Sequence, residues 1–343
     1  MFSSSDESDF EDYYRGRRPR IFRERINFEL MSYHSFNEKF RISFSVCEEL
    51  LRYIGPSLEH ETNRNHALSA KQQILIGLHW LGNGGQYHGV ADMHGVSKAT
   101  VCRVVKKVVN AINERVFPDK VKWPRNTADV VEKFYSIAGM PNVAGCIDGT
   151  LIKIDAPREH EDRFVDRHGN HSINCMLVCG PDLNFYYVSA RWPGKVHDAR
   201  VLRNSELFSK MNSGWRPHPR SILLGDSGYG CTDWLITPKN NITNDEAVQR
   251  FNRAHKSTRR LIENAFGVLK EKFPCLQKLR VNPIYACNIV KACATICNLT
   301  SNTLSEIGSE NDEEDDNSSR EEIEPDTQSG LTRRDEIINL FRQ

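Results

Sequence analysis

The sequence lacks any run of 18 or more apolar residues, so it predicts no membrane-spanning helix. Its start, with Ser3–Ser5 followed by acids, does not resemble an apolar signal segment, and we do not expect secretion. The ten cysteines also lack the spacing of a metal site, because the closest pairs, Cys175/Cys179 and Cys293/Cys297, have no matching histidines or cysteines. A zinc site or a disulfide framework is therefore disfavoured, and buried, reduced thiols of an intracellular protein are expected.

Charge is strongly separated along the chain, although the net charge is only +1. Residues 1–12 carry a net −5, residues 306–326 a net −10, and residues 327–343 a net +1. Subtracting these three segments from the total leaves +15 on residues 13–305. Such a basic body favours polyanionic partners such as nucleic acid, in an association that salt weakens. A solvated Lys/Arg surface without a ligand would give the same count.

The two ends of the chain are predicted to be disordered. Residues 1–25 are first acidic and then basic, and the cluster Arg15–Arg20 is typical of a nuclear-import signal, a nucleic-acid arm or a solvated tail. Residues 303–343 form an acidic, mostly disordered C-terminal tail. Within it, Thr332 is placed to cap a short helix over 333–341, which is either a docking peptide or, as we favour, a frayed end.

Between these ends there is room for about two domains, since 39% of the 343 residues are apolar. Residues 26–120 carry apolar side chains at three- and four-residue spacing, which predicts helices with one buried face. Residues 121–142, interrupted by Pro124 and Pro141, predict a linker. Residues 143–302 predict a mixed α/β sheet with helices on its faces. The strand-like runs there are 143–147, 151–154, 173–179, 185–189 and 221–225, and the helical ones are 197–208, 247–273 and 286–302.

A helix-turn-helix pattern occupies residues 86–110 of the helical region. A short helix ends near Gly95, which can adopt the left-handed conformation, and Ser97 is then placed to cap a second helix. The second helix has one apolar face and one polar, basic face that suits phosphate and major-groove contacts. Helix, turn and capped helix is also a common packing device. The candidate DNA contacts on this helix are Lys98, Thr100, Arg103, Lys106 and Lys107.

Three acids lie in three different kinds of local structure. Asp148 and Asp226 each follow an apolar strand-like run, with Gly149 after the first and Gly228 two residues after the second, so we expect both at strand ends that meet if the strands are neighbours. Glu263 lies on a predicted helix, at the margin of its apolar face, and can approach the sheet. Converging carboxylates suit a hard cation such as Mg²⁺ or Mn²⁺, and two such ions can assist cleavage of a phosphodiester.

Other charged residues surround these acids in the sequence. Arg259 could hold a phosphate or simply pair with Glu263 four residues away, although that pairing leaves the two aspartates unexplained. Asp198 is explained equally well as a metal ligand or as a helix N-cap. Its neighbour His197 is either a proton shuttle or a packed, hydrogen-bonded histidine. The candidate phosphate contacts on the helix of Glu263 are Arg253, Lys256, Arg259 and Arg260.

Four ordered motifs carry a family resemblance. They are Gly145-x-x-Asp-Gly-Thr150, Lys195-x-His-Asp-x-Arg200, Gly225-Asp-Ser-Gly-Tyr229 and Arg260-x-x-Glu-x-x-Phe-Gly-x-Leu-Lys270. Together they resemble the PIF/Harbinger class of DDE transposases, and more closely the domesticated Harbinger transposase-derived nucleases. The likeness covers about residues 30–300 and includes the helix-turn-helix, but not the acidic tail.

The resemblance implies a ribonuclease-H-like catalytic domain that acts on DNA as an endonuclease or strand transferase with Mg²⁺ or Mn²⁺. Asp148, Asp226 and Glu263 would form the DDE triad, and Asp198 would be a further metal-contacting acid. It also implies location in the nucleus, with the cytoplasm as a second location, and a separate Myb-like DNA-binding partner. A homo-oligomer stays open.

Two other functions compete with a nuclease. A domesticated transposase that no longer cuts could act as a DNA-binding or scaffold protein, because metal-binding residues can remain after the activity is lost. A metal-dependent phosphatase for small molecules would explain the acids, but neither the helix-turn-helix nor the basic body. A cleavage assay distinguishes a nuclease from the first alternative. Ligand binding that does not change with salt concentration would favour the second.

Overall fold

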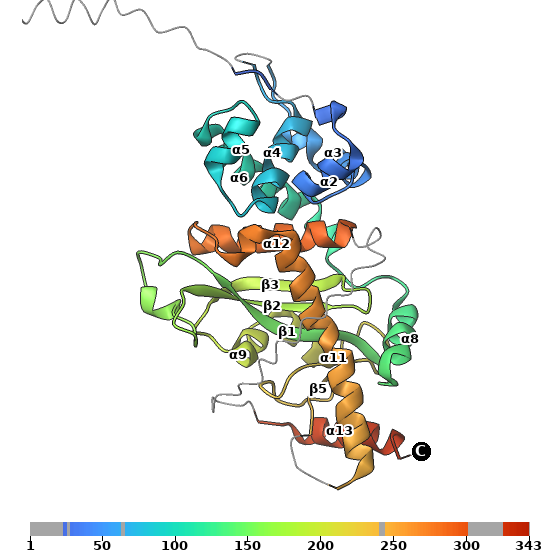
Figure 1. Ribbon diagram of the computed structural model, residues 1–343. Coiled ribbons are helices and arrows are strands. Elements are labelled where there is room, and N and C mark those ends of the chain that lie inside the picture. Colours follow the sequence, from blue (N-terminus) through green and yellow to red (C-terminus); the bar gives the residue numbers. More distant parts are fainter. Residues whose placement is uncertain (1–22, 26–27, 63–65, 240–243, 301–324, 343) are drawn as a thin grey trace, which may run out of the picture.

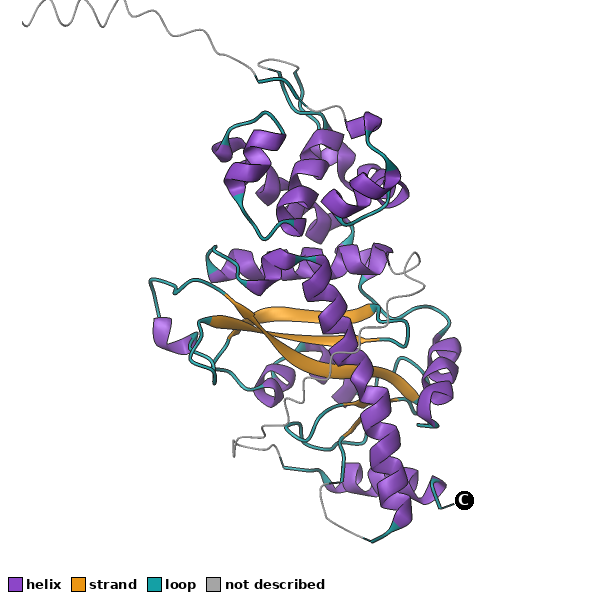
Figure 2. Ribbon diagram, in the orientation of Figure 1, coloured by secondary structure: helices purple, strands orange, loops and turns teal. Residues whose placement is uncertain are grey.

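The computed structural model describes residues 23–25, 28–62, 66–239, 244–300 and 325–342. A helical region lies on one side of the molecule and a sheet with flanking helices on the other, and α12 (Pro283–Thr300) runs between them (Figure 1). Figure 2 shows the same separation by secondary structure. No helix in these ranges is long and apolar enough to cross a membrane. The predicted N-terminal tail and most of the acidic segment fall outside the described residues.

The predicted helical region consists of short helices around an apolar core. The buried side chains recur at three- and four-residue spacing, as Leu50 and Ile54 or Ile74 and Leu78 illustrate, each with 0% exposure. Ser69 begins one of the helices with a capping box. The elements are η1 (Phe28–Leu30), α2 (Tyr33–Phe40), α3 (Phe44–Leu58), α4 (Ala70–Gly82), α5 (Tyr87–Met93), α6 (Lys98–Arg115) and α7 (Phe117–Lys120).

The sheet has five strands in the order β3-β2-β1-β4-β5. Strand β1 pairs antiparallel with β2 and parallel with β4, and β2 pairs antiparallel with β3. The two separate runs predicted at 143–147 and 151–154 are one continuous strand, because β2 pairs with the chain on both sides of Gly149. The strands are β1 (Val143–Lys153), β2 (Ser172–Cys179), β3 (Phe185–Pro193), β4 (Ile222–Leu224) and β5 (Leu235–Ile236).

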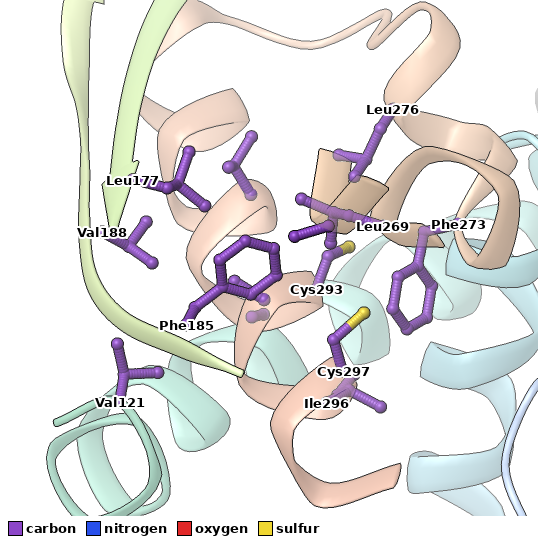
Figure 3. Close-up of a cluster of buried hydrophobic side chains, with 14 of the residues drawn as sticks. Val121, Leu177, Phe185, Val188, Leu269, Phe273, Leu276, Cys293, Ile296 and Cys297 are labelled. Atoms are coloured by element: carbon purple, nitrogen blue, oxygen red, sulfur yellow. The ribbon is translucent and has the colours of Figure 1, made fainter. Parts of the chain in front are cut away.

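Helices cover both faces of this sheet. On one face, α11 (Glu246–Lys272) and α12 pack through a core in which Phe185 and Phe273 are at most 1% exposed (Figure 3). On the other, α9 (Asp198–Arg203) and α10 (Glu206–Asn212) pack over Ile147 and Trp234. The mixed α/β, ribonuclease-H-like fold with flanking helices is therefore confirmed. Each fully buried large apolar side chain contributes roughly 1.5–3 kcal/mol, which holds α11 in place across the sheet.

Several predicted boundaries differ from the structure. The linker 121–142 contains a helix, α8 (Thr127–Ala138), which Asn126 caps and which buries Phe134. The helix predicted at 197–208 is two helices, because Ser205 caps a new one. Two short 3₁₀ helices, η2 (Glu161–Arg163) and η3 (Pro274–Gln277), complete the described elements of this part.

The last helix is not a frayed end. It begins earlier than predicted, as α13 (Gln328–Leu340), and its cap is Thr327 rather than Thr332. Ile337 and Ile338 are 2% and 3% exposed, and Phe341 packs against Phe251 of α11. Burial of this apolar face explains why the helix is docked although the preceding segment is acidic.

Candidate active site

The pairing of two parallel strands brings Asp148 and Asp226 together. Cys146 of β1 is the register partner of Leu224 of β4, and each aspartate lies two residues further along its chain. The predicted meeting of these acids through neighbouring strands is thus confirmed. The prediction that Asp148 ends a strand is wrong, since it lies inside β1 opposite Leu177. Asp226 does lie just beyond its strand, where the Gly228 N–H donates to its Oδ1 at 3.1 Å.

Arg259 connects Asp148 to the third acid, Glu263. Its guanidinium donates to Asp148 Oδ2 at 2.9 Å and to Glu263 Oε1 at 2.5 Å. Asp148 and Arg259 are largely buried, with side chains 16% and 21% exposed, whereas Glu263 is 48% exposed. The pairing of Arg259 with Glu263 is therefore present, but the same guanidinium also binds Asp148 on the sheet. The predicted apolar face of this helix is confirmed, with Ile262 and Leu269 both 0% exposed.

The fourth acid, Asp198, lies against the opposite face of β1. A Cβ atom added at Gly149 would lie 2.1 Å from Asp198 Oδ1, so only glycine leaves room for this carboxylate. The amide of Asn174 on β2 donates to the same oxygen at 2.6 Å and to the carbonyl of Val196 at 2.8 Å. Asp198 is the first residue of α9, and His197 is its N-cap, so the N-cap explanation for Asp198 is wrong.

His197 was predicted to be either a proton shuttle or a packed, hydrogen-bonded histidine; its side chain is exposed, so the packing part of that prediction is wrong, although the residue does have an interaction partner. Its role as a proton shuttle stays a prediction.

Burial and mutual repulsion raise the pKa values of the three aspartates. The pKa of Asp148 rises to about 8 because the carboxyl is buried and faces Asp226 and Asp198, although Arg259 opposes the shift. Burial also raises the pKa of Asp226 and of Asp198. A buried group of acids that repel one another is an environment that a divalent cation stabilises. The oxygen donors therefore fit a hard cation such as Mg²⁺ or Mn²⁺.

The geometry of Glu263 differs from that of a closed metal site. Across the described ranges, no group of three or more His, Cys, Asp or Glu side chains is arranged to hold a metal ion. The guanidinium of Arg259 lies between Asp148 and Glu263 and satisfies both carboxylates. For Glu263 to join the aspartates around a cation, Arg259 would have to move.

The sequence did not identify three neighbours of the acids. Asn174 orients Asp198, but a single asparagine within an apolar run carries no signal. Arg167 is an exposed cation that lowers the pKa of both Asp198 and Asp226. Tyr229 is 1% exposed beside the acids, and its hydroxyl has no hydrogen-bond partner within the described part of the chain. In the sequence, only the position of Tyr229 within the Gly225–Tyr229 motif indicated that it lies near the acids.

The candidate nucleic-acid contacts are mostly accessible. The helix pair has the predicted local structure, because Gly95 has a φ of +62° and the Ser97 side chain accepts a hydrogen bond from the Thr100 N–H. Thr100 is half-buried and its hydroxyl lies 2.9 Å from that of Ser97. The exposed candidate cations are Lys98, Arg103, Lys106 and Lys107 on α6, and Arg253, Lys256 and Arg260 on α11. Whether these residues contact DNA stays a prediction.

Comparisons with known proteins agree with this geometry. The family described as "DDE superfamily endonuclease" matches residues 147–298. The chain is 33% identical over 278 residues to the human protein named "Putative nuclease HARBI1", which covers 79% of this chain and 77% of that protein. It is 31% identical to the Xenopus laevis protein of the same name, over 73% of each.

A plant protein is also similar. The chain is 26% identical to the Arabidopsis thaliana "Protein ALP1-like", over 70% of this chain and 63% of that protein. No solved structure matches the chain.

Proposed function

The chain belongs to the Harbinger transposase-derived nucleases, whose domain is that of a DDE superfamily endonuclease, and from this premise we propose that it cuts DNA phosphodiesters with divalent metal ions. The observation that carries the proposal is the register of β1 and β4, which brings Asp148 and Asp226 side by side in a buried, mutually repelling pair. Such a pair has little structural use, since burying two carboxylates side by side destabilises a fold.

Each acid has a distinct part in the proposed site. Asp148 and Asp226 would hold the cation from the sheet, Asp198 would be a further contact beside Gly149, and Glu263 would complete the set from α11. When bound, Mg²⁺ or Mn²⁺ would polarise the scissile phosphate and lower the pKa of an attacking water. The acids are carried on paired strands and on a packed helix, which keeps them oriented for an in-line displacement.

Arg259 would have two states in this cycle. In the structure its guanidinium neutralises Asp148 and Glu263, as the largely buried ion pair shows. Released by the cation, it would face the phosphate, for which its planar, bidentate donors are suited. The exposed cations of α6 and α11 would hold the rest of the DNA backbone.

The test is a cleavage assay on DNA with Mg²⁺ or Mn²⁺. Asp148→Asn, Asp226→Asn and Glu263→Gln should each remove cleavage while leaving a folded protein that binds DNA. Glu132→Gln is the matched control, since Glu132 is also an exposed glutamate on a helix, α8, and is not one of the proposed ligands. Unchanged metal-dependent nicking by all three variants would refute the assignment.

A second function has one observation in its favour. Because Arg259 already satisfies Asp148 and Glu263, the site is charge-balanced in part without a metal, as expected of a protein that binds DNA but no longer cuts. This alternative predicts salt-dependent DNA binding and no cleavage by the wild-type protein under any metal. Cleavage that depends on Asp148 excludes it.

The partner and location follow from the family resemblance alone. We infer a separate Myb-like DNA-binding partner and action in the nucleus, where a strand-transfer step would also take place. The basic cluster Arg15–Arg20, outside the described residues, supports nuclear import. A reporter fused to residues 1–25 should accumulate in nuclei, and even distribution of the reporter would count against this role.

A further inference from the structure

A small pocket lies where the helical region meets the end of β1, away from the acids. One wall is formed by Trp80 of α4, Gly85 of the turn after it and Tyr87 of α5, and the other is the segment after η3, with Lys278 and Arg280. The pocket has room for about one water-sized atom. None of these residues takes part in the proposed catalytic site.

The indole N–H of Trp80 has no acceptor. Trp80 is 2% exposed, and its Nε1 is buried without a hydrogen-bond partner in the part of the chain that the structure describes. Gly85 lies against the same edge of the ring, since a Cβ there would come within 3.2 Å of Cζ2 and 3.5 Å of Cε2. A buried donor without a partner costs about 1–3 kcal/mol, so its persistence points to an acceptor that arrives from outside.

The opposite wall presents two cations in fixed positions. Leu279 is 1% exposed and is bound to the end of β1, where its N–H donates to the Lys153 carbonyl at 2.8 Å. Lys278 and Arg280 flank it in extended chain and so project to one side together. Lys278 pairs with Asp155 at 3.1 Å, but both side chains are 53% exposed, so this pair is weak and open to exchange.

The pocket also lies between the two surfaces that DNA would have to join. On one side, Lys106 of α6 has its ammonium 5.7 Å from the ring of Tyr285 on α12, which places the basic face of α6 beside this end of α12. On the other side, Leu279 is bridged to Ile154, which directly follows β1 and lies six residues after Asp148. At about 3.3 Å per residue this is about 20 Å, roughly six nucleotides of one strand.

We propose that one oxygen of a backbone phosphate enters this pocket, with the rest of the phosphate at its mouth, as the DNA passes from α6 to the catalytic acids. One phosphate oxygen accepts the N–H of Trp80, and Lys278 and Arg280 neutralise the charge. The inference rests on the proposed function, because it assumes that the ligand is the DNA that the site cuts. It adds a fixed point that sets the distance between the recognised sequence and the cleaved bond.

Trp80→Phe is the most specific test, because it keeps the aromatic ring and removes only the donor. DNA binding by the full-length protein should weaken about 2- to 10-fold, while the melting temperature stays the same or rises as the unpaired N–H is removed. Unchanged DNA affinity in a folded Trp80→Phe protein would overturn the proposal.

The charge is tested separately through the salt dependence of binding. Lys278→Ala with Arg280→Ala should lower the slope of log affinity against log salt by about 1 to 2, since each phosphate contact contributes about 0.9. Lys122→Ala with Lys210→Ala removes the same charge from exposed positions elsewhere and should leave the slope closer to that of the wild type. An equal loss in both double variants would show general attraction and no site.

These outcomes are distinct from those of the nuclease proposal. A wild-type protein that cuts DNA, with binding unaffected in Trp80→Phe and in Lys278→Ala/Arg280→Ala, overturns the phosphate pocket alone. Affected binding in a protein that never cuts supports the pocket and overturns the nuclease.

Discussion

Removing the charge of Asp148 should stabilise the metal-free protein. The carboxyl of Asp148 is 16% exposed and faces two other aspartates, which raises its pKa from 3.8 to about 8. Each tenfold change in proton affinity corresponds to about 1.4 kcal/mol, so holding this group charged at pH 8 costs at most about 6 kcal/mol of folding free energy. Relaxation of the cluster and the ion pair lost with Arg259 reduce the gain from Asp148→Asn below this limit. For a domain of this size, each kcal/mol that remains raises the melting temperature by about 2–4 °C.

The pH dependence gives the sign of the effect. Because the folded protein retains a proton on Asp148 that the unfolded chain releases, its free energy of unfolding falls as pH rises from about 4 to about 8. The advantage of Asp148→Asn should therefore be large at pH 8 and small at pH 5. Mg²⁺ should reduce this stability difference at pH 8. A cation that binds the wild-type acids stabilises the wild type more than it stabilises Asp148→Asn.

The assay is thermal unfolding of both proteins at pH 5 and pH 8, with a chelator or with Mg²⁺. A lower melting temperature for Asp148→Asn at pH 8 in chelator would refute this reasoning. So would a difference that is the same at both pH values.

Three further predictions concern neighbouring groups. Arg259→Gln should tighten Mn²⁺ binding at least about 10-fold in titration calorimetry, because the competing cation is gone, and weaker binding would instead mean that Arg259 organises the ligands. Gly149→Ala should slow cleavage about 100-fold with little change in DNA affinity, since its Cβ would displace the carboxylate that lies 2.1 Å away, and full activity would contradict the close approach. Burial lowers the pKa of His79 to about 4 and of His94 to about 3. As pH falls below 6.5, the unfolded chain therefore binds protons on these histidines before the folded protein does, and the free energy of unfolding decreases. Replacing both histidines by leucine should reduce the slope of the free energy of unfolding against pH. The reduction should be roughly 1.4 kcal/mol per histidine for each pH unit between 6.5 and 4, measured by urea unfolding at several pH values. An unchanged slope would mean that other groups cause the acid sensitivity.

The sequence predicted which kind of element carries Asp226 and Glu263, because those signals are local. An apolar run before each aspartate marked Asp148 and Asp226, and the three- and four-residue spacing around Glu263 placed it on a helix. The Gly95 turn and the Ser97 cap were also visible, since caps depend on a few adjacent residues.

What the sequence could not give depends on contacts between distant segments. The bond from Arg259 to Asp148 spans 111 residues, and nothing near either residue indicates it. The continuity of β1 through Gly149 follows from pairing with β2, which overrides the weak strand tendency of glycine. The docking of α13 likewise depends on a surface of α11 that receives Phe341, which the apolar face of α13 alone does not reveal.

The most direct measurement is a crystal structure of the protein soaked with Mn²⁺, with the ions located by anomalous scattering. The proposed function predicts a peak shared by Asp148 and Asp226, with Arg259 turned away and Glu263 moved toward the ion. Manganese bound elsewhere, or no peak at these acids while Arg259 keeps its bonds to Asp148 and Glu263, would contradict a metal-dependent nuclease.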